Sequence, residues 1–358
     1  MTSGGRLGHV GALDGIRGLA VAVVVVHHLK VPGVDGGWLG VDVFFALSGF
    51  LITVSVLGIA DGRLRPFLRR RFWRLAPALA VLLAWYVALA PDEDGRKWEY
   101  ALASAAQWIN VQGAVGGPFS DRLGHLWSLA AEVQFYVVWP ALLVLLVRWA
   151  APRLAVVGGL LVLFAATWVE RAVPWEGGTP WNRLYLGPDT RAAGLLGGCV
   201  VGLLFGWGAF DRSRAPTRAA AVLAVPALGF LAWFVAEESF LDGSVYRWSL
   251  GVAAASAAVL VAAGATSGGG PLRPVLELRP VRWLGRVSYS VYLWHVPLIA
   301  EVVRRWPDLG AAGRAAIVVP GTLVLATLSW VLVEKPLLRG PRRRSRRPPE
   351  PAGVASGP

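Results

Sequence analysis

Residues 13–29 read LDGIRGLAVAVVVVHHL, an apolar run with an arginine near its start and two histidines at its end. Such a run is typical of a helix that crosses a membrane, which needs about 20 apolar residues. The uncharged centre of this run is shorter than that, so a re-entrant segment is the alternative. In either case the ionisable side chains are costly where they stand, and they are candidates for function.

Similar apolar runs recur along the chain of 358 residues, of which 55% are apolar. A soluble protein of this length would not contain such runs. We therefore predict an all-α integral membrane protein, a single bundle of about ten transmembrane helices that occupies residues 1–339. Segment 98–112 is too polar to cross and is expected at the membrane interface. The predicted spans are 17–33, 38–58, 75–91, 126–147, 154–173, 190–208, 217–236, 248–265, 283–301 and 315–334.

The net charge of +13 is concentrated in short loops between the apolar runs. Most of these basic residues fall on one predicted side, which places both termini in the cytoplasm of a multi-pass protein of the cell membrane. Residues 340–358, GPRRRSRRPPEPAGVASGP, are expected to form a disordered tail whose arginines rest on anionic lipid. The charge therefore indicates membrane lipids as partners and gives no reason to expect nucleic acid.

Arg17 and His28 are eleven positions apart, which on an α-helix is three turns and nearly the same face. His27 points about 100° away. We expect Arg17 at the cytoplasmic edge of the membrane and His28 at or beyond its middle. The structural alternative is a histidine that caps the outer end of the helix by bonding a carbonyl.

The second span contains GVDVFFALSGFLIT at positions 40–53. Its glycines allow two helices to approach closely, and a seam of small residues also accounts for Ser48. The seam does not account for Asp42, a carboxylate inside an apolar run.

Arg71 and Arg74 are three apart and share a helical face at the predicted cytoplasmic boundary. They satisfy the positive-inside rule without any further role. Two guanidinium groups also suit bidentate binding of phosphate, and the two interpretations are compatible.

Glu132 lies in the apolar run GHLWSLAAEVQFYVVWP, positions 124–140, and shares a face with Tyr136. An unpaired carboxylate in the membrane is unfavourable, so Glu132 needs a partner, for which His28, Arg17 and His125 are candidates. A purely structural ion pair is the alternative.

Two further stretches carry polar groups that are weak indicators on their own. In GRVSYSVYLWHVPL, positions 285–298, Ser288, Tyr292 and His295 share one helical face. In DTRAAGLLGG, Asp189 and Arg191 begin the sixth span.

Taken in order, these stretches resemble acyltransferase family 3, the integral-membrane O-acyltransferases. The resemblance implies a ten-helix fold, an acyl-CoA co-substrate, often acetyl-CoA, and neither a permanently bound cofactor nor a metal. It also implies that His28 is the essential catalytic residue, that Arg17 supports it, and that Arg71 and Arg74 handle the CoA side. The matching stretches are LDGIRG, GVDVFFALSGFLI, RRFWRLAP, HLWSLAAEVQFYVVWP, DTRAAGLLGG, GRVSYSVYLWHVPL and the closing VEKPL.

The expected reaction moves an acyl group to a hydroxyl of a sugar-bearing acceptor, with His28 as general base or as transient acyl carrier. Glu132 is expected to orient the imidazole, and Ser48 is expected beside the two arginines at the acyl-CoA site. The acceptor is left open between a cell-surface glycan, a glycolipid and a macrolide-type metabolite. The remaining candidates for the substrate pocket are Asp14, Asp42, Tyr136 and His295.

A proton-coupled transporter or exporter is the alternative function, because buried histidines and carboxylates also form proton relays. The sequence shows no matching half-repeats that would favour it. A structural membrane scaffold would leave the buried charges unexplained.

Overall fold

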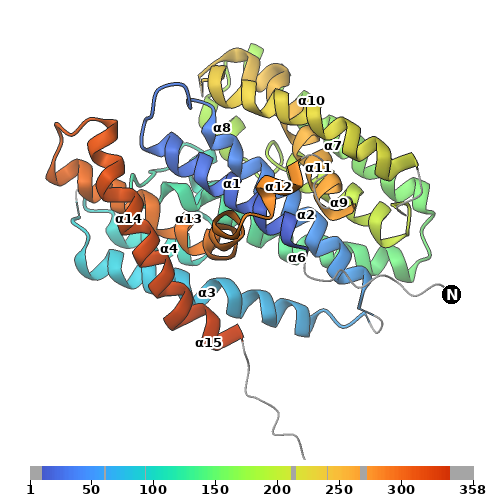
Figure 1. Ribbon diagram of the computed structural model, residues 1–358, viewed down its shortest axis with the longest axis horizontal. Coiled ribbons are helices and arrows are strands. Elements are labelled where there is room, and N and C mark those ends of the chain that lie inside the picture. Colours follow the sequence, from blue (N-terminus) through green and yellow to red (C-terminus); the bar gives the residue numbers. More distant parts are fainter. Residues whose placement is uncertain are drawn as a thin grey trace, which may run out of the picture.

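The computed structural model describes residues 10–59, 62–92, 94–210, 215–239, 241–266 and 272–338, and these residues form helices and no strand (Figure 1). The predicted disordered tail, residues 340–358, lies outside the described residues. The long helices are α1 (Gly11–His28), α2 (Gly40–Leu57), α3 (Arg65–Leu89), α6 (Trp127–Arg148), α7 (Arg153–Glu176), α9 (Ala193–Gly206), α10 (Ala215–Glu237), α11 (Leu250–Thr266), α13 (Arg279–Arg305) and α14 (Ala311–Ser329). The short ones are α4 (Lys97–Ala105), α5 (Ile109–Ala114), α8 (Trp181–Leu186), α12 (Arg273–Leu276) and α15 (Lys335–Leu338). Single turns complete the set: η1 (Gly37–Leu39), η2 (Gly124–Leu126), η3 (Val245–Ser249) and η5 (Trp330–Glu334).

Each of the predicted spans overlaps one long helix, and 8 helical segments of the described chain are long and apolar enough to cross a membrane. Helix α9 is too short to count among them, and α13 carries arginines at both ends. The all-helical multi-pass architecture is therefore confirmed, whereas the number ten and the cytoplasmic termini stay predictions. Segment 98–112 forms α4 and α5, each too short to span a bilayer.

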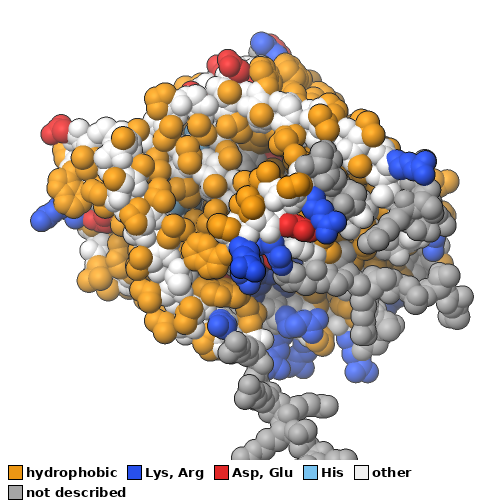
Figure 2. Space-filling model, viewed as in Figure 1, with side chains coloured by type: hydrophobic (Ala, Val, Ile, Leu, Met, Phe, Trp, Pro, Cys, Tyr) orange, Lys and Arg blue, Asp and Glu red, His pale blue; other side chains and the backbone are white. Residues whose placement is uncertain are grey.

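Apolar side chains cover most of the visible face of the molecule (Figure 2). Val138, Leu154 and Val162 are each more than 60% exposed, as side chains that face lipid are. Several lysines and arginines lie in the lower half of the same view. At the start of α3, Arg65 and Arg69 are exposed. An apolar band with a basic rim is what a membrane-embedded bundle requires.

Helix α1 begins six residues earlier than predicted and ends at His28 instead of residue 33. The reason is close packing against α12 and α13. A Cβ atom on Gly15 would lie 2.2 Å from the carbonyl oxygen of Leu276, and one on Gly285 would lie 1.8 Å from that of Asp14. This contact holds the polar LDGIRG segment in the helix. Arg17 therefore lies inside α1, and its position at the cytoplasmic edge of the membrane stays a prediction.

Helices α2 and α9 also pack backbone against backbone. A Cβ on Gly49 would lie 2.1 Å from the Leu195 carbonyl oxygen, and one on Gly198 would lie 2.1 Å from that of Ala46. The glycines of the second span are thus explained by packing, as expected. The close approach brings the start of α9 beside the start of α2.

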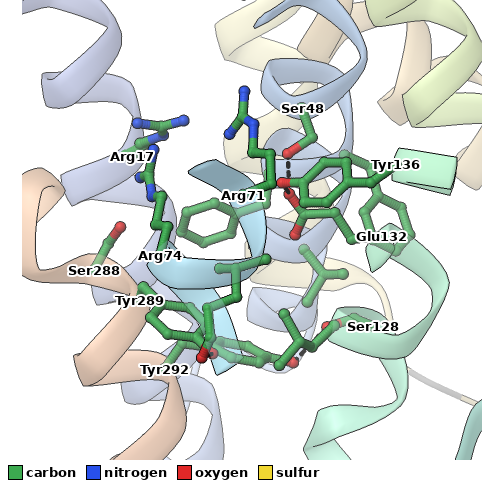
Figure 3. A pocket seen from close by; sticks show the side chains of 15 residues that line it. Arg17, Ser48, Arg71, Arg74, Ser128, Glu132, Tyr136, Ser288, Tyr289 and Tyr292 are labelled. Carbon is green, nitrogen blue, oxygen red and sulfur yellow. Dashed lines mark hydrogen bonds between the residues drawn. The ribbon is translucent and has the colours of Figure 1, made fainter. Parts of the chain in front are cut away.

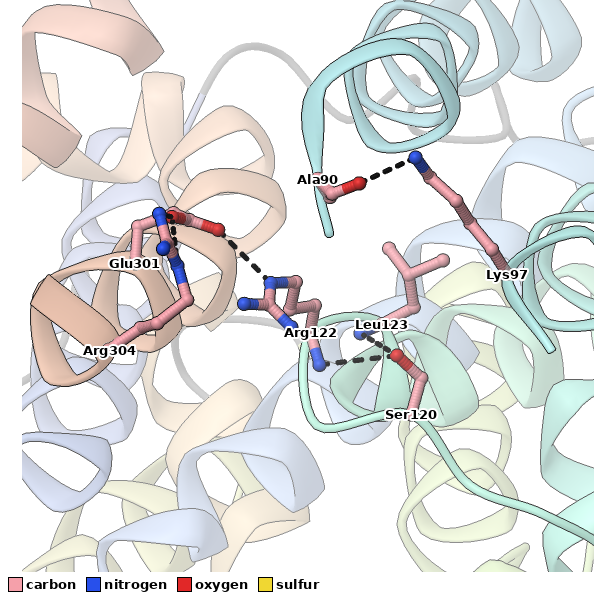
Figure 4. Close-up of polar contacts among 7 residues, drawn as sticks. All are labelled: Ala90, Lys97, Ser120, Arg122, Leu123, Glu301 and Arg304. Atoms are coloured by element: carbon pink, nitrogen blue, oxygen red, sulfur yellow. Dashed lines mark hydrogen bonds and ion pairs between the residues drawn. The ribbon is translucent and has the colours of Figure 1, made fainter. Parts of the chain in front are cut away.

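A partly buried ion pair joins the loop before α6 to the C-terminal part of α13 (Figure 4). Arg122 Nε donates to Glu301 Oε1 at 3.1 Å, and Arg304 Nη2 donates to Glu301 Oε2 at 2.8 Å. The Ser120 hydroxyl oxygen accepts hydrogen bonds from the backbone N–H groups of Arg122 and Leu123. These bonds fix the turn η2, which carries His125, against α13.

Candidate active site

A charged pocket, which we call the arginine pocket, lies where α1, α2, α3, α6 and α13 meet (Figure 3). Its cavity volume is about 70 Å³. Six of the predicted site residues line it, namely Arg17, Ser48, Arg71, Arg74, Glu132 and Tyr136. The other lining residues are Val41, Phe44, Phe45, Leu75, Ser128, Leu129, Ser288, Tyr289 and Tyr292.

The guanidinium groups of Arg17, Arg71 and Arg74 gather at one end of the pocket (Figure 3). Within the described part of the chain none of the three takes part in an ion pair. Glu132 is the only acidic side chain that lines the pocket, so its net charge is positive. Unneutralised guanidinium groups of this kind suit an anionic ligand, above all a phosphate.

Aromatic rings hold Arg71 in place. Its guanidinium carbon lies 5.5 Å from the centroid of the Phe67 ring and 5.2 Å from that of Tyr136. These contacts orient the charged group without neutralising it.

Glu132 has other partners than the sequence suggested. Its Oε1 accepts hydrogen bonds from the hydroxyl groups of Ser48 and Tyr136. The expectation that Glu132 orients His28 is therefore wrong for this structure. The part of α1 that lines the arginine pocket is the turn around Arg17, and His28 lies three turns away at the end of that helix.

Asp42 does not line the arginine pocket, and its assignment to the substrate pocket stays a prediction. Its Oδ2 accepts a hydrogen bond from Arg191 Nη2 at 2.8 Å, and the two side chains are 2% and 1% exposed. The Arg191 guanidinium lies 4.8 to 5.8 Å from the ring centroids of Trp38, Trp127 and Tyr185. Asp42 and Arg191 thus form a sealed pair that packs α2 against α9.

Asp14 also lies outside the lining of the arginine pocket. It stands on α1 at the contact with α13, where its carbonyl oxygen faces Gly285. Its position favours a part in helix packing over contact with a substrate.

His28, His125 and His295 form what we call the histidine cluster. The ring centroids of His28 and His295 are 4.9 Å apart, and those of His125 and His295 are 5.4 Å apart. His28 Nδ1 lies 2.8 Å from the carbonyl oxygen of Val24, and the side chain of His27 instead bonds the Val34 carbonyl at 3.2 Å. The structural alternative for His28 was a histidine that bonds a carbonyl at the helix end. His28 does form this bond, but its ring also faces other histidines.

Tyr292 joins the histidine cluster to the arginine pocket. Its hydroxyl lies 2.7 Å from Ser128 Oγ and donates to the His125 carbonyl oxygen at 2.6 Å. Ser128 and Tyr292 both line the arginine pocket, and the Tyr292 ring lies 5.4 Å from the rings of His125 and His295. The histidine cluster, which includes the predicted catalytic residue His28, therefore lies behind the wall that Tyr292 forms in the arginine pocket.

An apolar groove of about 450 Å³ adjoins the arginine pocket between α3 and α6. It shares Arg71, Leu75, Leu129 and Tyr136 with that pocket. Its other walls are mainly leucine, alanine and valine, so it offers an apolar approach to the charged groups.

Sequence reasoning missed several buried polar groups. It considered His125 only as a partner for Glu132. It recognised that Ser288, Tyr292 and His295 share a helical face, but not that His125 lies against that face. It also gave no sign of Arg171, which is buried and donates to the carbonyl oxygen of Thr190 at 2.5 Å. Among the described residues no group of three or more metal-ligating side chains is arranged to hold a metal.

Outside the predicted membrane spans, Arg183 and Asp189 form a half-exposed ion pair between α8 and α9. Arg183 Nη1 and Nη2 donate to the two carboxylate oxygens at 2.9 and 2.5 Å. This bidentate hydrogen bonding holds the pKa of Asp189 below its usual value.

A family model described as "Acyltransferase domain" matches residues 10–334 of the chain. The chain is 33% identical over 361 residues to the peptidoglycan O-acetyltransferase OatA of Listeria monocytogenes, covering 92% of this chain and 56% of that protein. It is 34% identical over 369 residues to the putative peptidoglycan O-acetyltransferase YrhL of Bacillus subtilis, covering 95% of this chain and 56% of that protein.

The O-acetyltransferase OatA of Staphylococcus aureus is 28% identical over 344 residues, or 91% of this chain and 56% of that protein. The chain thus spans just over half the length of these curated relatives. No solved structure matches it.

Proposed function

Since the chain belongs to the acyltransferase family whose model covers residues 10–334, we propose that it is a membrane O-acetyltransferase that acts on hydroxyl groups of a cell-surface glycan. The observation that carries this proposal is the arrangement of two sites that share Tyr292 as a wall. One is a pocket where three guanidinium groups face a single carboxylate, and the other is a cluster of imidazoles. Acyl transfer from a phosphate-bearing thioester to an alcohol needs both.

The proposed donor is acetyl-CoA, bound from the cytoplasmic side. Its phosphates would pair with Arg71 and Arg74, whose helix α3 begins with the exposed basic Arg65 and Arg69 of the predicted cytoplasmic face. Arg17 adds a third positive charge at the same end of the pocket. The acetyl group would pass the wall formed by Tyr292 to reach the histidine cluster.

His28 is the proposed general base. Its Nδ1 faces the Val24 carbonyl oxygen, which can only accept a hydrogen bond, so the ring hydrogen of the neutral imidazole is assigned to Nδ1. Nε2 then keeps its lone pair and takes the proton of the acceptor hydroxyl while the oxygen attacks the thioester carbonyl. The carbon–sulfur bond breaks, and the proton passes to the departing CoA sulfur.

In the second form of this proposal, His28 Nε2 attacks the thioester itself and carries the acetyl group before the acceptor arrives. Trapping of radiolabelled acetyl-protein in the absence of acceptor would support this form. Failure to trap it under rapid quench supports direct transfer.

The names of the relatives favour peptidoglycan, among the acceptors considered, over a glycolipid or a macrolide-type metabolite. Family membership likewise favours an enzyme over a transporter.

The test compares His28→Ala with His27→Ala in purified protein reconstituted in lipid nanodiscs. Transfer from radiolabelled acetyl-CoA to peptidoglycan glycan fragments, and release of free CoA, are measured together. Loss of a general base lowers kcat by about 10²- to 10⁴-fold, so His28→Ala should be nearly inactive. His27→Ala, which removes a neighbouring ring of the same helix end, should keep measurable activity. The reverse result would contradict the assignment of His28.

A further inference from the structure

The histidine cluster contains two buried ring nitrogens that have no hydrogen-bond partner among the described residues, His295 Nε2 and His125 Nδ1. In each ring the other nitrogen faces a backbone carbonyl. His295 Nδ1 lies 2.7 Å from the Tyr292 oxygen, and His125 Nε2 lies 3.3 Å from the Leu293 oxygen. Because a carbonyl can only accept, each neutral imidazole places its one hydrogen there and leaves a bare acceptor inside the bundle.

His28 has the same arrangement, since its Nδ1 faces the Val24 carbonyl oxygen. Its ring and that of His295 meet edge to face, with centroids 4.9 Å apart and an interplanar angle of 84°. In the neutral state both rings offer lone pairs, so neither can donate to the other through Nε2. A proton on His28 Nε2 changes this, because the imidazolium is a donor and the adjacent His295 ring carries an acceptor, Nε2, that has no partner among the described residues.

We propose that His295 is a positioning residue for the reaction, which accepts a hydrogen bond from protonated His28 and so stabilises the imidazolium formed during transfer. This inference rests on the proposed function, in which His28 is the general base. The proton leaves the acceptor hydroxyl, resides on His28 Nε2 and passes to the CoA sulfur, while His295 neither gains nor loses a proton. A charge-assisted bond of this kind is stronger than one between neutral groups.

A packing role does not account for the choice of residue. His295 is fully buried on α13, and a buried acceptor without a donor is less favourable than an apolar side chain of similar shape. The other titratable groups around His28 are His27 and Lys30, which belong to its own helix end. Among the three histidines of the cluster, only His295 contacts the rings of both of the others and bonds a residue that lines the arginine pocket.

Two conservative variants separate the two ring nitrogens of His295. His295→Asn keeps an N–H group near the Nδ1 position for the Tyr292 carbonyl but ends short of Nε2. His295→Gln extends an amide oxygen to about the Nε2 position, where it can accept. Both are measured for kcat and for the KM of acetyl-CoA, with the nanodisc assay and the peptidoglycan fragments described above.

We expect His295→Asn to lower kcat by about ten- to a hundredfold, the effect of one charge-assisted hydrogen bond, with the KM of acetyl-CoA unchanged. His295→Gln should recover most of that loss. Trp294→Phe is the matched control on the same helix, since it also removes a buried ring N–H and should leave kcat unchanged. Equal kcat values for the Asn and Gln variants, or a wild-type kcat in both, would overturn the role of the Nε2 acceptor.

The outcome for His28 is read in the same assay. If wild-type protein transfers acetyl groups and His28→Ala does not, a flat response to the His295 variants defeats this inference alone. If wild-type protein transfers none, or His28→Ala transfers them normally, the proposed function fails and the inference fails with it. Thermal unfolding of each variant in detergent identifies one that is merely unfolded, and the Asn and Gln pair is then compared with the wild type at a temperature where all three are folded.

Discussion

The arginine pocket and the Asp42–Arg191 pair both place guanidinium groups among apolar helices, yet they differ in what surrounds the charge. Arg191 has a carboxylate at 2.8 Å and three aromatic rings, and it is 1% exposed. Arg17, Arg71 and Arg74 have no ion-pair partner among the described residues and line a cavity. The charges of the buried pair oppose each other directly, whereas the open pocket still has positive charge to offer a ligand.

This difference explains why burial in the membrane does not by itself identify a functional residue. Asp42 looked like a candidate for the substrate pocket because an isolated carboxylate in an apolar run needs a reason. The reason is Arg191, which is 149 positions later in the chain. The comparison predicts that the sealed pair governs stability and that the open pocket governs substrate binding.

The largest expected effect is on stability, from Arg191→Leu. It leaves the Asp42 carboxylate buried without its partner, which costs about 3–5 kcal/mol of folding free energy. Thermal unfolding of the detergent-purified protein should show a large drop or a loss of folded material. Replacing Asp42 and Arg191 together by leucine should cost less than Arg191→Leu alone, and Arg74→Leu should leave the unfolding temperature unchanged. An unaffected Arg191→Leu protein would remove the distinction between the two regions.

The second effect is on binding, from Arg71→Ala combined with Arg74→Ala. Each lost charge-assisted contact with a phosphate is worth about 1.5–3 kcal/mol, so the KM of acetyl-CoA should rise at least tenfold. The unfolding temperature should not change. Acetyl-pantetheine, which lacks the nucleotide phosphates, should show the same KM with the wild type and the double variant. A flat KM for acetyl-CoA would leave these arginines with a role in membrane orientation alone.

The smallest effect comes from the half-exposed Arg183–Asp189 pair, which has neither the seal of Asp42 nor the cavity of Arg71. An exposed pair contributes about 0–1 kcal/mol. Because the folded-state pKa of Asp189 is lowered, its contribution is present above the unfolded value of about 3.9 and is lost as the pH falls through the folded value. Asp189→Asn should therefore destabilise slightly at pH 7, and the difference from the wild type should shrink as the pH falls below about 3.9. Arg183→Gln should show the same dependence, and a difference that grows as the pH falls would contradict it.

The sequence predicted the helices well because hydropathy reports burial in lipid directly. The sequence also predicted most residues of the arginine pocket, because Arg71 and Arg74, and likewise Glu132 and Tyr136, are spaced to share a helical face. It could not predict which residues meet across helices, because that depends on the rotation of each helix about its axis. Glu132 consequently bonds Ser48 and Tyr136 and not His28.

The start of the first helix was misplaced for a related reason. LDGIRG is too polar to be predicted as membrane helix, yet it is helical and packs closely on α12 and α13. Hydropathy scores a segment by its own residues, so a helix stabilised by a neighbouring backbone escapes it.

That backbone contact has a mechanical consequence. Gly18 of α1 and Gly285 of α13 hold the two helices together at one end, with no side chains between the backbones, while His28 and His295 lie farther along the same two helices. A larger side chain at this contact would push α1 and α13 apart and increase the distance between the two imidazole rings. The distance between the His28 and His295 rings therefore depends on two glycines, about three helical turns away.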